Sequence, residues 1–172
     1  ILKIKIYIIY IDNKMADFTT KTFIKHDDYM TPFSAWDNIK QYIPKDKIIW
    51  EAFYGDGESG EHLTKLGFET IHKEIDFFES DEGEIIVSNP PFSLVKKIVP
   101  KLIELDKPFI LLMPVSKIAT QYFKPLKNKV QIIIPEKRIN FIKNGNEKTS
   151  NCNFDCFYYC YKIELEEDIT WL

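Results

Sequence analysis

The stretch that decides the fold is KIIWEAFYGDGESGEHLTKL, residues 47–66, in which an apolar run is followed by a glycine-rich loop and a segment with helical spacing. The apolar run at 47–53 predicts a short buried strand, and residues 61–66 predict a helix that ends at Gly67. The loop glycines are Gly55, Gly57 and Gly60. Because glycine has no side chain, backbone amides in this loop can approach a ligand, and the start of the helix favours an anionic group such as a carboxylate.

Strand and helix patterns alternate along the rest of the chain. Residues 34–42 predict a helix, and its apolar face consists of Ala35, Trp36, Ile39 and Ile43. Further strands are predicted at 68–73, 75–77, 84–88, 109–113, 130–134 and 154–163, and further helices at 93–105 and 118–126. Alternating units joined by short links are typical of an α/β domain. We therefore expect a doubly wound, mostly parallel sheet of seven strands with helices on both faces.

The length of the chain fits one domain. With 172 residues and 45% hydrophobic content, it can bury about two-thirds of the surface that its unfolded form exposes. The first methionine is Met15, and the apolar run from Ile1 to Ile11 is too short to span a bilayer. We interpret residues 1–14 as an extension, either an extra edge strand or, by preference, sequence upstream of the natural start. Residues 15–172 then form the single domain.

The charge is unevenly distributed. A net charge of −3 argues against a protein that coats nucleic acid by charge alone. Residues 91–150, however, carry 12 Lys or Arg against 4 Asp or Glu, a balance of +8. This basic middle could face a phosphate backbone, or it could be an ordinary solvated lysine surface.

A proline-rich turn follows the strand predicted at 84–88. Its residues are Asn89, Pro90, Pro91 and Phe92. Two successive prolines stiffen the turn and donate no hydrogen bonds, which leaves its carbonyls free to accept. The Asn89 side-chain oxygen and the Pro90 carbonyl could accept both hydrogens of a planar amine, and Phe92 could stack on a flat substrate. The turn therefore predicts a site that directs an amine nitrogen toward an alkyl donor, although a plain turn after a strand would have the same sequence.

Three cysteines, Cys152, Cys156 and Cys160, lie four residues apart. In a strand they would project to one face with about 13 Å between neighbours, which is too far to share one metal ion. We expect buried thiols in a reducing cytoplasm and no metal site.

Four segments together resemble the S-adenosylmethionine-dependent amino-methyltransferases. Residues 51–57 resemble the first motif of that family, D-P-F-x-G-x-G, and residues 89–92 resemble its fourth, [DNS]-P-P-[YFW]. Residues 29–32 resemble the upstream cofactor motif, and residues 76–78 the acidic-aromatic motif before the catalytic strand. The order of the motifs is similar to that of adenine N6-methyltransferases of phages and large DNA viruses.

This resemblance implies a Rossmann-like class I methyltransferase fold, S-adenosyl-L-methionine as cofactor, and a role for each matching residue. The implied catalytic residues are Asn89, Pro90, Pro91 and Phe92. The implied cofactor residues are Tyr29, Thr31, Pro32, Glu51, Phe53, Gly55, Gly57, Gly60, Glu74, Asp76 and Phe77. Among these, Tyr29, Thr31 and Pro32 would surround the methionine part, and the glycine loop would hold its carboxylate. Glu74 would bind the ribose, while Asp76 and Phe77 would border the adenosine or the target base.

The chain departs from the family pattern in three respects. Glu51 stands where the family usually has Asp, and Glu74, close to Asp76, is the only candidate for the acidic residue that normally ends the second strand and binds the ribose. In addition, only 28 residues separate Gly60 from Asn89, which leaves no room for a target-recognition domain. Recognition would then fall to the loops at 117–129 and 136–150. The candidate nucleic-acid contacts are Lys117, Lys137, Arg138 and Phe141.

The sequence thus predicts methyl transfer to the N6 amine of adenine in nucleic acid, with DNA ranked ahead of RNA. Two alternatives remain open, namely methylation of a protein glutamine amide, which poses the same problem at nitrogen, and a catalytically silent partner subunit. We expect a cytoplasmic location, or the host-cell cytoplasm for a viral protein, and no association with membranes. A homodimer or a partner chain would help to select the target.

Overall fold

A seven-stranded sheet forms the centre of the computed structural model, which describes Asp27, residues 29–142 and residues 154–172. The strands are β1 (Ile49–Trp50), β2 (Thr70–Ile71), β3 (Ile85–Ser88), β4 (Phe109–Pro114), β5 (Val130–Ile134), β6 (Cys156–Tyr161) and β7 (Ile169–Trp171). Their order is β2-β1-β3-β4-β6-β5-β7. Four of the six neighbouring pairs are parallel, and only β6 runs antiparallel to its neighbours β4 and β5. The predicted α/β class and mostly parallel sheet are confirmed.

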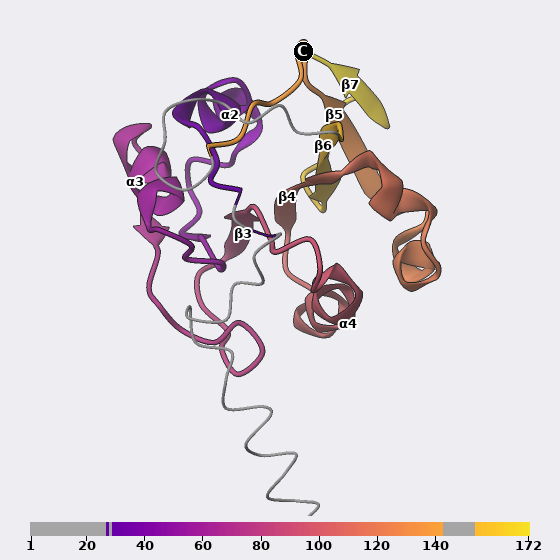
Figure 1. Ribbon diagram of the computed structural model, residues 1–172, viewed down its shortest axis with the longest axis horizontal. Helices are drawn as coiled ribbons and strands as arrows, with labels where there is room; N and C mark the ends of the chain where they lie inside the picture. The colour runs from indigo at the N-terminus through magenta and orange to yellow at the C-terminus, as the bar shows by residue number, and fades with distance from the viewer. Residues whose placement is uncertain (1–26, 28, 143–153) are drawn as a thin grey trace, which may run out of the picture.

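Helices cover both faces of the sheet, as predicted (Figure 1). They are α2 (Phe33–Asp37), α3 (Glu58–Lys65) and α4 (Val95–Leu105), with 3₁₀ helices η2 (Lys40–Tyr42), η3 (Val115–Ala119) and η4 (Gln121–Leu126). Successive residues of a strand point to opposite faces. In β1, Ile49 therefore packs with the side chains of α2 and α3, whereas Trp50 packs with those of α4 and η4.

The helix predicted at 34–42 is divided into α2 and η2. Pro32 lies just before α2 as its N-cap residue, with an extended backbone that has φ of −68° and ψ of 151°. The predicted apolar face survives the division, since Ala35, Trp36, Ile39 and Ile43 are all buried. The end of α3 is also as predicted, because Gly67 follows it with φ of +92°, a conformation in which glycine avoids the steric cost of a side chain.

The strand predicted at 75–77 is wrong. An Asp76 carboxylate oxygen accepts a hydrogen bond of 2.8 Å from the backbone N–H of Phe78, and the backbone N–H of Glu79 donates to the Asp76 carbonyl at 3.3 Å. Such local bonds from an aspartate favour a turn over a strand. Phe77 is buried against Trp50, so its apolar character serves the core without a sheet partner.

Two further segments differ from the prediction. The helix expected at 118–126 consists of the 3₁₀ helices η3 and η4, which are separated by Thr120 in an extended conformation. No strand was predicted at Ile169–Trp171, where β7 pairs in parallel with β5 at the edge of the sheet. The loop that precedes β7 is held by Gln131 of β5, whose side chain donates hydrogen bonds to the carbonyls of Leu165 and Glu167.

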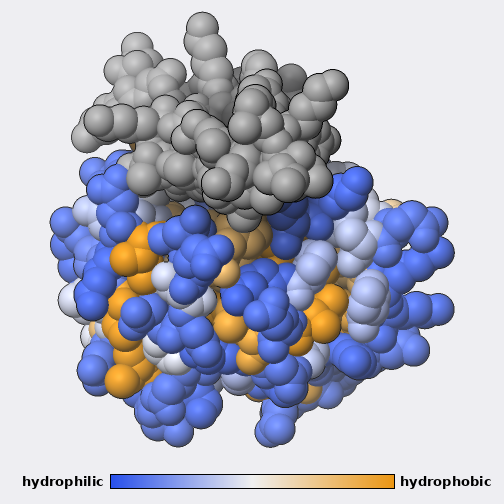
Figure 2. Space-filling model, turned by 90° about the horizontal axis from the view of Figure 1, so that it is seen from below, coloured by the Kyte–Doolittle hydropathy of each residue, from blue (hydrophilic) through white to orange (hydrophobic). Residues whose placement is uncertain are grey.

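The cysteines of β6 lie in the interior. Cys156 and Cys160 are buried on one face of the sheet, and burial raises the pKa of the Cys160 thiol to about 12. Cys152 and residues 1–14 lie outside the described residues. Within the described ranges, no cluster of three or more His, Cys, Asp or Glu could hold a metal ion, and no helix is long and apolar enough to cross a membrane. On the face shown in Figure 2, hydrophobic residues are interspersed with hydrophilic ones.

Candidate active site

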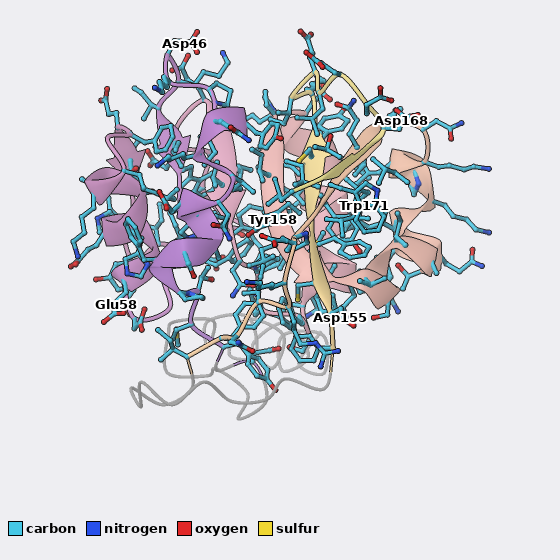
Figure 3. The ribbon with its side chains drawn as sticks, turned by 90° about the horizontal axis from the view of Figure 1, so that it is seen from above. Asp46, Glu58, Asp155, Tyr158, Asp168 and Trp171 are labelled. Carbon is cyan, nitrogen blue, oxygen red and sulfur yellow. The ribbon has the colours of Figure 1, made fainter. Side chains whose placement is uncertain are left out.

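The carboxyl ends of β1 and β3 lie side by side in the sheet, because Trp50 pairs in parallel with Ile86. In α/β sheets, ligands commonly bind outside this edge. Figure 3 shows Glu58 and Asp155 at one end of the molecule and Asp46 and Asp168 at the other. Glu58 begins the helix that follows β1, and Asp155 precedes the antiparallel strand β6, so both mark the carboxyl edge.

A cleft lies at this edge and opens to solvent, and its empty space, open mouth included, is about 430 Å³. The cleft is lined by Asp27, Tyr29, Met30, Thr31, Glu51, Phe53, Tyr54, Gly55, Asp56, Ser59, Asn89, Pro90, Pro91 and Phe92. The structure thus brings the whole proline turn together with part of the predicted cofactor set.

Asn89 is held by its amide nitrogen. The Nδ2 group donates a hydrogen bond of 2.9 Å to the backbone carbonyl of Tyr29, on the segment that precedes α2. The Asn89 Oδ1 atom is buried and has no hydrogen-bond partner among the described residues. A buried acceptor without a partner costs about 1–3 kcal/mol. A ligand that donates a hydrogen bond to Oδ1 would recover that cost.

Glu51 is buried at the end of β1, with 1% of its surface exposed. The hydroxyl of Ser88, on the adjacent strand β3, donates to its Oε1 atom. The Oε2 atom has no partner in the described part of the chain. Burial raises the pKa of Glu51 to about 8, and the hydrogen bond from Ser88 offsets only part of this rise. The carboxyl group therefore remains largely protonated near neutral pH, unless a cation or a further donor binds to it.

A third buried oxygen belongs to Thr31, which is 3% exposed and whose Oγ1 atom also has no partner among the described residues. The unpartnered oxygens of Thr31, Glu51 and Asn89 come from three separate segments and belong to residues that line the same cleft. Native proteins rarely leave buried polar atoms unsatisfied. Their concentration here indicates a ligand-binding site.

The loop glycines have different structural roles. Gly55 lines the cleft with φ of +59°. A Cβ atom on Gly57 would lie 2.8 Å from the Tyr54 hydroxyl oxygen, and one on Gly60 would lie 2.2 Å from the His72 ring. Gly57 and Gly60 therefore permit close packing of Tyr54 and His72, and neither glycine lines the cleft.

The Phe92 ring belongs to a cluster of four aromatic side chains. Tyr29 lies nearly parallel to it, with ring centroids 6.1 Å apart, and Phe141 and Phe154 meet it edge-on at 6.2 and 5.5 Å. Tyr29 also contacts Phe141 and Phe154 directly. These contacts fix the ring that was predicted to stack on the substrate. Phe141, proposed from the sequence as a nucleic-acid contact, is fully buried and supports Phe92 from the interior.

The structure does not bring every predicted cofactor residue to the cleft. Those that do not line it are Pro32, Gly57, Gly60, Glu74, Asp76 and Phe77. Phe77 packs against Phe53, which does line the cleft, with ring centroids 4.8 Å apart. Asp76 lies in the turn that replaced the expected strand.

The other predicted nucleic-acid contacts lie around the carboxyl edge. Arg138 forms a two-point ion pair with Asp155, at 2.7 and 3.1 Å, and Lys137 is exposed. The half-buried Lys117 donates from Nζ to the backbone carbonyl of Phe92 at 3.0 Å. Lys143 and Lys148 of the same basic middle lie outside the described residues.

Sequence reasoning missed several cleft residues. The carboxylate of Asp27 accepts hydrogen bonds from the backbone N–H and the hydroxyl of Ser93. Ser59 accepts a bond of 3.0 Å from the Trp36 indole. Ser88 does not line the cleft but anchors Glu51, and it was the easiest to find, since it precedes Asn89 at the end of a buried strand, where a polar side chain needs a partner.

Comparisons with known proteins support the fold. No protein-family model and no curated protein sequence matches the chain. The chain is similar to the crystal structure of a dimethyladenosine transferase from Plasmodium falciparum, with a TM-score of 0.50 and 12% sequence identity. The match covers 77% of this chain and 62% of that chain, so the likeness extends over less than two-thirds of the neighbour. At this identity it shows the fold, which is the Rossmann-like methyltransferase fold predicted from the sequence.

Proposed function

We propose that the chain is an S-adenosylmethionine-dependent N-methyltransferase that acts on the N6 amine of adenine in nucleic acid, with DNA ranked ahead of RNA. The observation that carries this proposal is the Asn89 Oδ1 atom. It is buried, lacks a partner among the described residues, and is oriented by the bond from Nδ2 to the Tyr29 carbonyl. An acceptor held in this way suits the N–H group of a planar amine.

The residues of the cleft fit the methionine end of the cofactor, which carries an ammonium and a carboxylate group. The unpartnered Oε2 of Glu51 can accept a hydrogen bond from an ammonium group, and Thr31 Oγ1 offers a second polar contact. Backbone amides near Gly55 and the start of α3 favour the carboxylate. When bound, the cofactor would supply a methyl group already activated on its sulfonium sulfur.

The protein contributes positioning to this reaction. Asn89 Oδ1 and the Pro90 carbonyl would accept the two amine hydrogens and orient the nitrogen lone pair toward the methyl donor, while Phe92 would stack on the base. Both acceptors also stabilise the positive charge that develops on the amine nitrogen. Correct orientation of the two reactants lowers the barrier without a strong base.

Two further observations support adenine in nucleic acid over a protein glutamine. The basic middle of the chain extends from this turn, and the structural neighbour is by its name a dimethyladenosine transferase. We place the activity in the cytoplasm, where a buried thiol such as that of Cys160 remains reduced.

The proposal is tested by incubating the protein with methyl-labelled cofactor and separate DNA, RNA and protein fractions, followed by digestion and identification of the labelled product. Label in N6-methyladenine supports the proposal, and the labelled fraction decides between DNA and RNA. Label in glutamine would replace it with the second enzyme hypothesis. The matched controls are Asn89→Ala, which removes the acceptor, and Asn89→Asp, which keeps a carbonyl oxygen. No cofactor binding by calorimetry at high protein concentration would contradict both enzyme hypotheses and favour the silent partner subunit.

A further inference from the structure

Lys117 joins the amine-binding turn to the basic part of the chain. Its Nζ atom donates to the Phe92 carbonyl at 3.0 Å. Its own backbone is held by Thr120, whose hydroxyl donates to the Lys117 carbonyl at 2.6 Å. The ammonium group is therefore fixed beside the residue proposed to stack on the target base.

The charge of Lys117 is not balanced by a carboxylate in the described part of the chain. None of the ion pairs found there includes Lys117. An ammonium group has three N–H donors, and the Phe92 carbonyl accepts one of them. Lys117 therefore keeps donors and a full charge for a ligand.

A basic segment continues away from Lys117. Residues 115–129, which include η3 and η4, contain four lysines and no Asp or Glu. Lys124, Lys127 and Lys129 are exposed along it. An array of exposed lysines that begins at the target-binding turn is suited to a phosphate backbone that leads into the site.

We infer that Lys117 binds a phosphate group beside the target adenine while it holds the Phe92 carbonyl, so that the site selects adenine within a phosphodiester chain over the same base beside a neutral linkage. This inference rests on the proposed function. A phosphate contact has a second effect, because an unbalanced ammonium close to the target would oppose the positive charge that develops on the amine nitrogen. The phosphate neutralises that ammonium at the moment when the substrate is correctly placed.

The test compares two versions of the shortest oligonucleotide in which an adenine becomes methylated. One version has normal phosphodiester linkages, and the other has neutral methylphosphonate linkages on both sides of the target adenine. Wild-type protein and the variants Lys117→Met, Lys117→Arg and Lys124→Met are assayed on both. Lys124→Met is the matched control, since it removes an exposed lysine from the same basic segment but not from the turn.

We expect Lys117→Met to lower kcat/KM on the normal oligonucleotide by about 10- to 100-fold, the range for a lost hydrogen bond to a charged group. The methylphosphonate version should lower the wild-type value similarly but change the Lys117→Met value by less than about threefold, because the two changes remove the same contact. Lys117→Arg keeps the charge and should retain the preference for the phosphodiester. Lys124→Met should leave that preference at the wild-type ratio.

Several results would overturn the inference. Equal losses for Lys117→Met on both oligonucleotides would show that Lys117 only supports the turn, and a wild-type rate that is insensitive to methylphosphonate would exclude the phosphate contact. Calorimetry with the cofactor shows whether each variant is folded. If Lys117→Met does not fold, a wild-type rate that is insensitive to methylphosphonate still overturns the inference, and so does a loss of the phosphodiester preference in Lys124→Met equal to the full wild-type preference. Failure of the proposed function looks different, because the wild-type protein would then methylate neither oligonucleotide.

Discussion

The ends of β1 and β3 are neighbours in the sheet and solve a similar problem with different chemistry. Each carries a side chain with one polar group anchored and one oxygen that is buried and unpartnered among the described residues. In Glu51 the anchor is the Ser88 hydroxyl, and in Asn89 it is the Tyr29 carbonyl. The difference is that Glu51 can ionise and Asn89 cannot. The β1 end can therefore balance a cationic ligand, whereas the β3 end offers a neutral acceptor at every pH.

The comparison first predicts different responses of the two ends to pH. The folded pKa of Glu51 is about 8 against an ordinary value of 4.5. Between these two pH values the folded state therefore holds a proton that the unfolded state has lost. The contribution of the protonated Glu51 carboxyl group to the free energy of unfolding is complete below pH 4.5 and is lost as the pH rises toward 8. The linkage relation gives about 1.4 kcal/mol per pH unit, or about 5 kcal/mol over the whole interval.

The measurement is denaturant unfolding of cofactor-free protein from pH 4.5 to 8.5, with Glu51→Gln as the matched neutral variant. Glu51→Gln should approach wild-type stability at the acid end and exceed it increasingly toward pH 8. The same series with Asn89→Ala should run parallel to wild type. A constant difference between wild type and Glu51→Gln would contradict this account of Glu51.

The second prediction concerns catalysis at the β3 end. Asn89→Ala should lower kcat by about 10²- to 10³-fold, the usual loss when an oriented hydrogen-bonding group is removed from a transition state. Its cofactor affinity should stay within about threefold of wild type, because the other unpartnered oxygens of the cleft belong to Glu51 and Thr31. Methyl transfer under single-turnover conditions and calorimetry separate the two quantities. A variant that loses cofactor binding and activity together would show that the two ends are not separate sites.

The third prediction tests the anchor of Glu51. Ser88→Ala removes the hydroxyl that donates to the buried Oε1 atom of Glu51, which should cost about 1–3 kcal/mol of unfolding free energy. Ser88→Thr keeps the hydroxyl and serves as the control. Denaturant unfolding at pH 6 measures both variants. Wild-type stability in Ser88→Ala would mean that Glu51 is held by other contacts.

The smallest effect is expected at an exposed pair on the same edge. Asp155→Asn removes the carboxylate that pairs with Arg138, and both side chains are at least half exposed. Surface ion pairs contribute about 0–1 kcal/mol, so unfolding free energy should change by less than about 1 kcal/mol. If Asp155→Asn lost as much unfolding free energy as Ser88→Ala, burial would not explain why the Glu51 carboxyl group contributes more to stability than the surface ion pair.

Much of the fold could be predicted because its signals are local. Six of the predicted strands coincide with strands of the structure, since apolar runs between turn residues are typical of buried strands. Residues 75–77 have the same apolar signal, but the Asp76 carboxylate forms a turn there and the expected strand is absent. Strand β7 has only three residues, and pairing with β5 defines it more than its composition does.

The proline turn and the glycine loop were recognisable from the sequence, because each needs particular residue types at fixed spacing. Their supports were not recognisable. Asp27 lies 66 residues before Ser93, and Lys117 lies 25 residues after Phe92, so no local pattern connects either pair. The burial of Phe141 could not be predicted either, because an aromatic residue in a basic segment can be exposed or buried. Its contacts with Tyr29 and Phe92 place it in the interior.

The sequence by itself determined the α/β class and the chemistry offered by Glu51 and by residues 89–92, because backbone preferences and side-chain functional groups belong to each residue wherever it lies. Only the tertiary structure decided that the oxygens of Thr31, Glu51 and Asn89 belong to one cleft, and that Glu51 shares a hydrogen bond with Ser88. The physical reason is burial. The pairing of β1 with β3 removes water from these groups, and the loss of water raises the pKa of Glu51 and leaves acceptors for a ligand to satisfy.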